Sequence, residues 1–245
     1  MSKKAISISL ICMSIMLAVI ISGCTLMASP YATLAPSPTP QVNTTAGDIP
    51  QAFDFNRAHW FEWSEALYMG AGSQSPSAVS DFRIEYGNEI YNGSGARHCR
   101  LHVSTDNGNS LYDLDYYYDI ANRRILYAKS VNTVQSGLSE RVETFEAPRG
   151  DSDTSGDAAK AVTNVRRFDP YLKNDSWAGG RPVGDETITI EKGTYDCKKF
   201  ETTEGATGIL TYWWHPEAPM RLRSISAETK PGEEARFVIE LKDWG

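Results

Sequence analysis

The sequence has no clustered positive charge and shows none of the residue patterns on which common enzyme classes depend. It carries 24 Lys+Arg against 31 Asp+Glu, a formal net charge of −7. Nucleic-acid binding needs a concentrated basic surface, so this balance argues against it and against a polybasic contact with a membrane. The motifs G-x-S-x-G and H-E-x-x-H are absent, and the chain has only four histidines. We therefore predict that the protein is not an enzyme.

Sites for phosphates, metals and cofactors are also lacking. Gly70-Ala71-Gly72 has no strand-to-helix setting in which a glycine loop holds a phosphate. His98 and His102 would lie about 13 Å apart along a strand, too far for both to bind one ion at ~2 Å each. The acidic run from Asp151 resembles the start of a calcium loop, but Val162 stands where the bidentate acid belongs. We expect no metal and no cofactor.

A long apolar run lies at the start of the chain. Lys3 and Lys4 precede the apolar residues 5–21, and Ile21-Ser22-Gly23-Cys24 follows. This pattern resembles a lipoprotein signal peptide, in which small residues precede the cleavage site and the cysteine thiol takes a diacylglyceryl group. An ordinary membrane anchor is the alternative, because about seventeen apolar residues are near the lower limit for crossing a bilayer. The resemblance implies an exported protein, anchored through Cys24 to the outer face of the cell membrane or to the cell envelope.

A spacer of low charge follows Cys24. Residues 25–50 have no charged side chain before Asp48 and contain five prolines. Such Thr/Ser/Pro-rich sequence buries no core and tends toward extended polyproline II, which rises ~3.1 Å per residue. We predict a signal peptide over residues 1–23, a lipidated stalk over residues 24–50 and one β-rich globular domain over residues 51–245. No second Pro-rich linker divides the last segment.

An imperfect internal repeat organises the predicted domain. Gly95-Ala96-Arg97-His98-Cys99 is echoed by Gly193-Thr194-Tyr195-Asp196-Cys197, and an aromatic strand and a further strand follow each copy. Apolar and polar residues alternate with a period of two, which is typical of a sheet with one buried and one wet face. The sequence predicts a mostly β fold: a single antiparallel curved sheet (a half-barrel) built from two related meanders, with at most short helices. Residues 59–69 fit a helix or a strand, of which aromatic content favours the strand, and residues 158–168 fit a short helix.

Part of the second copy resembles a known group of proteins. The stretch from Gly193 through Thr211-Tyr212-Trp213-Trp214 to Glu240-Leu241-Lys242-Asp243-Trp244-Gly245 is similar to the meander of outer-membrane lipoprotein carriers and receptors (the LolA/LolB-like group) and of related exported proteins. The resemblance implies an open curved sheet around an apolar cavity that holds acyl chains, lidded by helices in some members. It transfers no functional residue, because no motif matches one to one.

Aromatic rows and two cysteines are the candidate functional residues of the domain. If the curved sheet leaves a cavity, aromatic side chains in its wall contact acyl chains; the alternative is that they fill the core. Export permits a disulfide between Cys99 and Cys197, and two buried thiols at equivalent repeat positions are the alternative. The aromatic candidates are Tyr112, Tyr116, Tyr118, Trp213 and Trp214.

These patterns lead to one function hypothesis and one alternative. We expect a membrane-anchored exported lipoprotein whose domain is a non-enzymatic binding module for a hydrophobic or lipid-like ligand. The alternative is a structural or protein-interaction domain of the cell envelope without a small-molecule ligand. The expected partners are the membrane, through the lipid on Cys24, and either a hydrophobic ligand or an envelope protein. Nucleic acid is not an expected partner.

Overall fold

A computed structural model describes residues 57–70, 72–172, 180–204, 208–228 and 235–245 of the chain. All of these residues belong to the unit formed by residues 44–245. The predicted signal peptide, the lipidated Cys24 and the stalk lie outside the described residues, so they stay predictions. None of the helices among the described residues has the length and apolar character that a bilayer crossing needs.

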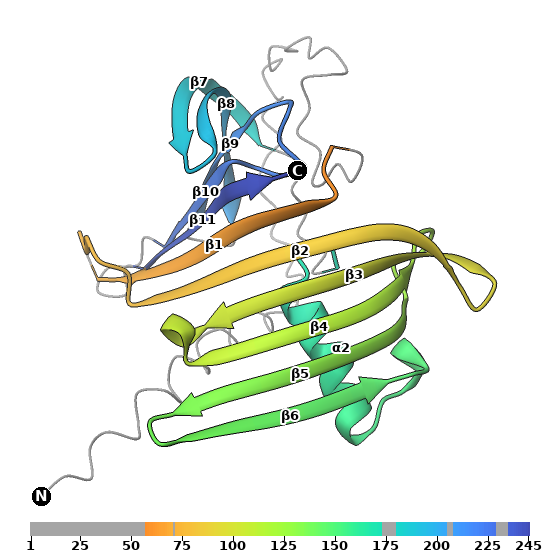
Figure 1. Cartoon of the computed structure of the whole chain (residues 1–245). Helices are drawn as coiled ribbons and strands as arrows, with labels where there is room; N and C mark the ends of the chain where they lie inside the picture. Colours follow the sequence, from red (N-terminus) through yellow and green to blue (C-terminus); the bar gives the residue numbers. More distant parts are fainter. Residues whose placement is uncertain (1–56, 71, 173–179, 205–207, 229–234) are drawn as a thin grey trace, which may run out of the picture. The chain divides into compact units, whose positions relative to one another are not determined.

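The described residues form an antiparallel sheet of eleven strands, with one α-helix lying across one face (Figure 1). The helical elements are the 3₁₀ turns η1 (Asp106–Gly108) and η2 (Gly150–Ser152) and the helix α2 (Gly156–Phe168). The strands are β1 (Trp60–Met69), β2 (Ala78–Tyr91), β3 (Ser94–Thr105), β4 (Ser110–Asp119), β5 (Ile125–Ser136), β6 (Ser139–Ala147), β7 (Arg181–Ile190), β8 (Gly193–Glu204), β9 (Gly208–Trp214), β10 (Arg223–Glu228) and β11 (Ala235–Trp244).

The sheet is made of two meanders placed side by side. Its order is β6-β5-β4-β3-β2-β1-β11-β10-β9-β8-β7, so β2–β6 and β7–β11 run across the sheet in the same sense, with β1 between them. The two echoed sequence segments fall on β3 and β8, the second strand of each meander. The predicted fold class is confirmed: the sheet is curved and open, with β6 and β7 at its edges (Figure 1). Residues 60–69 form a strand, and the helix expected over residues 158–168 is part of α2.

A tight turn sets the register of β2 and β3. Asn92 and Gly93 join the two strands, and both have positive φ angles, 48° and 80°. Two central residues in this region give a turn whose twist matches that of the strands. Asparagine tolerates this conformation and glycine adopts it freely, so the Asn-Gly sequence favours it. The result is unbroken pairing from Tyr91 opposite Ser94 to Asp81 opposite Ser104.

The core of the first meander lies between the sheet and α2. The helix packs on β4, β5 and β6, and its side chains Ala161, Val165 and Phe168 are buried. The Phe168 ring lies 4.8 Å from the ring of Tyr112 and 6.3 Å from that of Phe82, measured between centroids. Burial of a side chain such as Phe168 stabilises a fold by about 1.5–3 kcal/mol. The helix is therefore held mainly by its apolar contacts with the sheet.

The second meander is curled, so that β7 comes close to β10 and β11. The backbone N–H of Lys192, in the turn between β7 and β8, donates to the carbonyl oxygen of Lys242 in β11 at 3.1 Å. The Arg223 guanidinium of β10 donates to the carbonyl oxygen of Thr189 in β7 at 3.3 Å. The first and last strands of this meander are thus brought together without pairing along their length.

A buried carboxylate fixes the chain where α2 ends. Asp169 is 1% exposed and accepts a hydrogen bond from the hydroxyl of Tyr116 on β4. It also accepts hydrogen bonds from the backbone N–H groups of Tyr171 and Leu172, at 2.7 and 3.0 Å. A buried donor that loses its acceptor costs the full desolvation penalty of the group. Asp169 therefore connects the end of α2 to β4.

Replacement of this carboxylate will destabilise the domain. We expect Asp169→Ala to lower the free energy of unfolding by about 2–4 kcal/mol, because two buried donors and one partly buried donor lose their acceptor at once. Asp185→Ala, at an exposed position of β7, is the matched control and should change it by less than about 0.5 kcal/mol. Denaturant unfolding followed by circular dichroism measures both. Equal stability of the two variants would contradict the role given to Asp169.

Candidate functional site

The three predicted ligand-binding tyrosines of β4 are packed in the core. Tyr116 and Tyr118 are 0% and 1% exposed. The hydroxyl of Tyr116 donates to Asp169, and the ring of Tyr118 lies 5.6 Å from that of Tyr171. Burial raises the pKa of both tyrosines above the ordinary value. Tyr112, which is half-buried, packs against Phe168 of α2.

The two predicted ligand-binding tryptophans of β9 lie in different clusters. Trp213 belongs to the main core, and its indole N–H donates to Glu186 at 3.0 Å. Trp214 belongs to a second cluster with Phe200 and Tyr212. Successive residues of a strand point to opposite faces, so these two side chains do not share a wall. Neither of the two grooves found on the sheet is lined by any of the five predicted aromatics, which corresponds to the core-filling alternative.

The disulfide predicted between Cys99 and Cys197 is wrong. Both cysteines are buried free thiols, on β3 and β8, which five strands separate in the sheet. Equivalent positions of a side-by-side repeat are displaced by the width of the repeat, whereas a disulfide needs Cα atoms about 4.4–6.8 Å apart. Burial raises the pKa of Cys197 to about 11 and that of Cys99 well above its ordinary value. Both thiols are therefore held in their protonated form.

Thiol alkylation checks this correction. Iodoacetamide at about pH 8, without reductant, should leave Cys99 and Cys197 of the folded chain unmodified, because the thiolate is the reactive form. After unfolding in guanidinium chloride, each should gain one carbamidomethyl group, measured by peptide mass spectrometry. If a disulfide were present, both would stay unmodified until a reductant was added.

The histidines and the acidic loop considered as metal sites have other partners. His98 pairs with Glu89 and Asp115, whereas His102 pairs separately with Asp113. Asp151 accepts hydrogen bonds from Arg166 of α2 and from the backbone of Ile125, at 2.8 and 3.0 Å. Across the described ranges, no group of three His, Cys, Asp or Glu side chains is placed to hold a metal ion. The Asp151 carboxylate instead connects α2 to the start of β5.

The sheet face opposite α2 carries an ordered row of charges, which we call the charge ladder. Each of its members lies directly opposite the next on the neighbouring strand, from β2 to β6, and the sign of the charge alternates along the row. Lys129 Nζ, for example, lies 3.3 Å from a carboxylate oxygen of the last member. The members are Glu85, Arg100, Asp115, Lys129 and Glu146.

A row of rings lies beside the charge ladder. His98 on β3 is opposite Tyr117 on β4, and their rings stack with centroids 4.3 Å apart and planes 6° apart. Tyr91 stacks on Tyr117 at 4.5 Å. The His98 ring is held at both nitrogens, Nδ1 by Glu89 at 3.2 Å and Nε2 by Asp115 at 2.6 Å. Its position and orientation are therefore fixed by the sheet.

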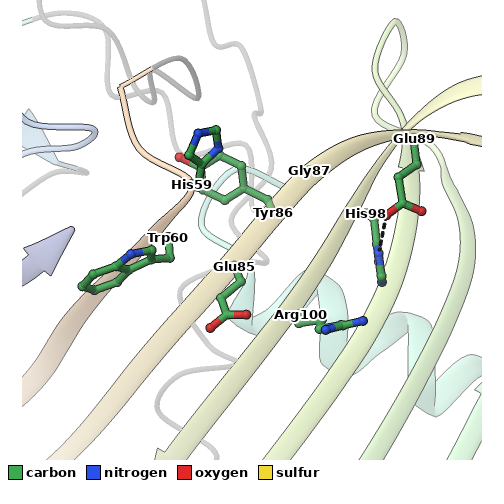
Figure 2. Close-up of a pocket in the computed structure, with 8 residues that line it drawn as sticks. All are labelled: His59, Trp60, Glu85, Tyr86, Gly87, Glu89, His98 and Arg100. Carbon is green, nitrogen blue, oxygen red and sulfur yellow. Dashed lines mark hydrogen bonds and ion pairs between the residues drawn. The ribbon is translucent and has the colours of Figure 1, made fainter. Parts of the chain in front are cut away.

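Two grooves run over this polar face. The first, of about 450 Å³, is shown in Figure 2 and is lined by His59, Trp60, Glu85, Tyr86, Gly87, Glu89, His98 and Arg100. The second, of about 400 Å³, lies over β2–β5 and is lined by Arg83, Glu85, Arg100, Leu101, His102, Asp113, Leu114, Asp115, Lys129 and Val131. Because Glu85 and Arg100 line both, the grooves form one trough across the strands.

Arg100 is the cation between the two grooves. Glu85 and Asp115 lie opposite it on the neighbouring strands, but Glu85 pairs with Arg83 at 3.0 Å and Asp115 pairs with His98. The side chain of Arg100 makes no hydrogen bond or ion pair with the residues that the structure describes. Its guanidinium, with five N–H donors and no acceptor, is left to contact whatever enters the trough.

Sequence reasoning did not identify Gly87, Glu85 or Arg100 as functional residues. The available signal was the polar half of the alternation: residues 98–102 and 113–117 place charged or ring side chains at every second position, and residues 83–89 do the same except at Gly87. That signal shows which residues share a face but not which lie opposite one another. The register, and with it the trough, comes from the structure.

Comparisons with known proteins do not assign the chain to a family. No protein-family model and no curated protein matches it. Among solved structures, it is similar to the crystal structure of a DUF1329 family protein from Desulfovibrio piger, with 12% sequence identity and a TM-score of 0.29 over 76% of this chain and 85% of that one. A likeness of this strength supports no inference about function. The resemblance to outer-membrane lipoprotein carriers and receptors stays a prediction.

Proposed function

We propose that this chain is an exported lipoprotein, anchored through acyl chains on Cys24, whose β-rich domain is a non-enzymatic binding module of the cell envelope. The domain binds its partner on the open polar face, not in the interior of the sheet. The observation that carries this proposal is the trough of mixed charge over β2–β5, with the guanidinium of Arg100 uncommitted at its centre.

The position of the trough suits a tethered binding protein. Residues 57–59 lead into β1, and His59 and Trp60 line the first groove. The predicted stalk precedes this point in the sequence, and the groove lies beside the first residues of the domain that the structure describes. Anchoring through two acyl chains, at about 0.8 kcal/mol per buried CH₂, would hold such a domain firmly at the membrane.

The chemistry of the trough favours binding over catalysis. Its lining residues include no serine, threonine or cysteine that would act as a nucleophile beside a base. Glu85 and Glu89 share one face of β2 but are four residues apart, which is about 13 Å along a strand. Paired carboxylates in glycoside hydrolysis lie closer, at about 5–9.5 Å. These two acids are placed to hold a ligand at two points.

Replacement of the lipidated cysteine tests the anchoring. The full chain, expressed in a bacterial host, should enter the membrane fraction with a diacylglyceryl group on an N-terminal Cys24. We expect Cys24→Ser to lose this modification and to appear as uncleaved precursor or as soluble exported protein. Cys12→Ser, in the predicted signal peptide, is the matched control and should behave as the wild type. Fractionation with intact-mass measurement distinguishes these results.

The anchoring proposal has a clear contrary outcome. An ordinary membrane-spanning anchor would keep residues 1–23 on the mature protein and would need no thiol. If Cys24→Ser remains in the membrane with the same N-terminal sequence as the wild type, the lipoprotein assignment is wrong. The binding proposal for the polar face would not be affected.

A hydrophobic or lipid-like ligand is the second candidate. Its support is the apolar surface under α2, where Phe168 packs on Phe82 and Tyr112. In the described conformation the helix occupies this surface, so an acyl chain would have to displace it. Such displacement would break the contacts of Asp169 with Tyr116 and the backbone.

Native mass spectrometry of the purified wild-type and Cys24→Ser chains, each taken from the fraction in which it appears, separates the two candidates. Because Tyr116 and Tyr118 are fully packed, we expect the non-lipidated Cys24→Ser chain to carry no co-purified lipid. A stoichiometric lipid in the wild type and in Cys24→Ser, lost in Phe168→Ala, would favour the hydrophobic ligand. Phe168→Ala should itself destabilise the fold by about 3–5 kcal/mol, so folding is checked by circular dichroism.

A further inference from the structure

The first groove has a glycine for its floor. Gly87 lies opposite His98 in the pairing of β2 with β3, and a Cβ atom added to Gly87 would meet no other atom within 4 Å. Its φ angle is not in the positive range. The backbone therefore does not require glycine here, and the missing side chain leaves open space above the strand (Figure 2).

One wall of this space is the face of a fixed ring. β3 lies between β2 and β4, so Tyr117 covers the His98 ring on the β4 side. The other face of the ring is turned toward β2 and Gly87. Glu89 and Asp115 hold both ring nitrogens, which prevents the ring from rotating into the space. The flat face of the imidazole ring thus lies beside the open space over Gly87.

The rim of the groove carries both donors and acceptors. Glu85 and Glu89 provide carboxylate oxygens, and Arg100 provides guanidinium N–H groups. The two carboxylates make the site unfavourable for an anion. A ligand that both donates and accepts hydrogen bonds, and that has an apolar ring face, satisfies all of these groups.

A sugar ring has this combination of properties. The C–H face of a pyranose packs on aromatic or imidazole rings, while its hydroxyl groups donate to carboxylates and accept from guanidinium. The first groove, at about 450 Å³, lies within the range of about 300–1,000 Å³ typical of ligand sites. The second groove shares Glu85 and Arg100 with it, so the trough extends beyond one ring.

We propose that the trough binds a neutral oligosaccharide, with one pyranose ring seated over Gly87 against the face of His98. The inference deepens the proposed binding function and rests on the polar face being the binding surface. It does not depend on the lipid anchor. In this arrangement Glu85, Glu89 and Arg100 select for hydroxyl groups, and the second groove takes the neighbouring sugar.

A substitution at Gly87 that fills the open space without changing the fold is the most direct test. Gly87→Val places a side chain in the open space, and valine favours strands. Gly95→Val on β3 is the matched control, because Gly95 also has a non-positive φ and no atom within 4 Å of its added Cβ, and it lines neither groove. Both variants should keep the wild-type circular dichroism spectrum and denaturation midpoint, or gain stability.

Binding is measured by calorimetry on the full chain, in a detergent without a sugar head group. The probes are chitohexaose, cellohexaose and maltohexaose. We expect at least one to bind with a dissociation constant of roughly 0.01–1 mM. Gly87→Val and His98→Ala should each weaken this binding by at least about tenfold, and Gly95→Val should not change it.

Two results would contradict the assignment of a sugar ligand. Absence of binding to all three probes, or equal binding by Gly87→Val and the wild type, excludes this site. Crosslinking in intact envelopes then separates the two proposals. A protein partner captured by the wild type and by Gly95→Val, but not by Gly87→Val, would preserve the binding function and replace the sugar with a protein ligand. If no sugar binds and no protein partner is captured in this pattern, the proposed binding function of the polar face is also wrong.

Discussion

Side chains of a strand alternate between two faces, and the register of β2–β6 turns this alternation into two continuous surfaces. Placing Tyr112, Tyr116 and Tyr118 against α2 commits Asp113, Asp115 and Tyr117 to the other face. The same strand pairing therefore forms both the packed interior and the polar trough. A shift of one residue between β3 and β4 would bury charges and expose the aromatic row. The Asn92-Gly93 turn preserves the pairing of β2 with β3, and the Asp169 carboxylate holds Tyr116 of β4 on the buried face.

The period of two along each strand is a local signal, so the sequence is enough to predict the sheet, the strand at residues 60–69 and the two related meanders. Register depends on partners far apart in the chain, and no local pattern contains it. The error over Cys99 and Cys197 has this origin. Equivalence in the repeat suggests proximity, but the two strands are six inter-strand steps apart, at about 4.8 Å per step along the sheet. For the same reason, the sequence alone did not show that Gly87 on β2 lies opposite His98 on β3.

The charge ladder contributes little to stability for the number of charges that it contains. Exposed ion pairs are worth about 0–1 kcal/mol each, and Arg100, the second member of the ladder, has no ion pair among the described residues. Apolar contacts with α2 and the buried Asp169 carry the first meander instead. Residues of the ladder are thus free to vary without loss of the fold. A surface of this kind can be tuned to a ligand independently of the core.

The pairing of β1 has a mechanical consequence for a tethered domain. This strand lies between β2 and β11, with backbone hydrogen bonds on both sides, and the N–H groups of His59 and Trp60 donate to Gly245 at its start. Tension arriving through residue 57 therefore enters the middle of the sheet and pulls along the strand. Because this pull is parallel to the strand, the hydrogen bonds on both sides of β1 share the load in shear. The first groove is lined by His59 and Trp60, by β2 and by β3, so in such a tethered domain a ligand held there would lie next to the strand that takes the load.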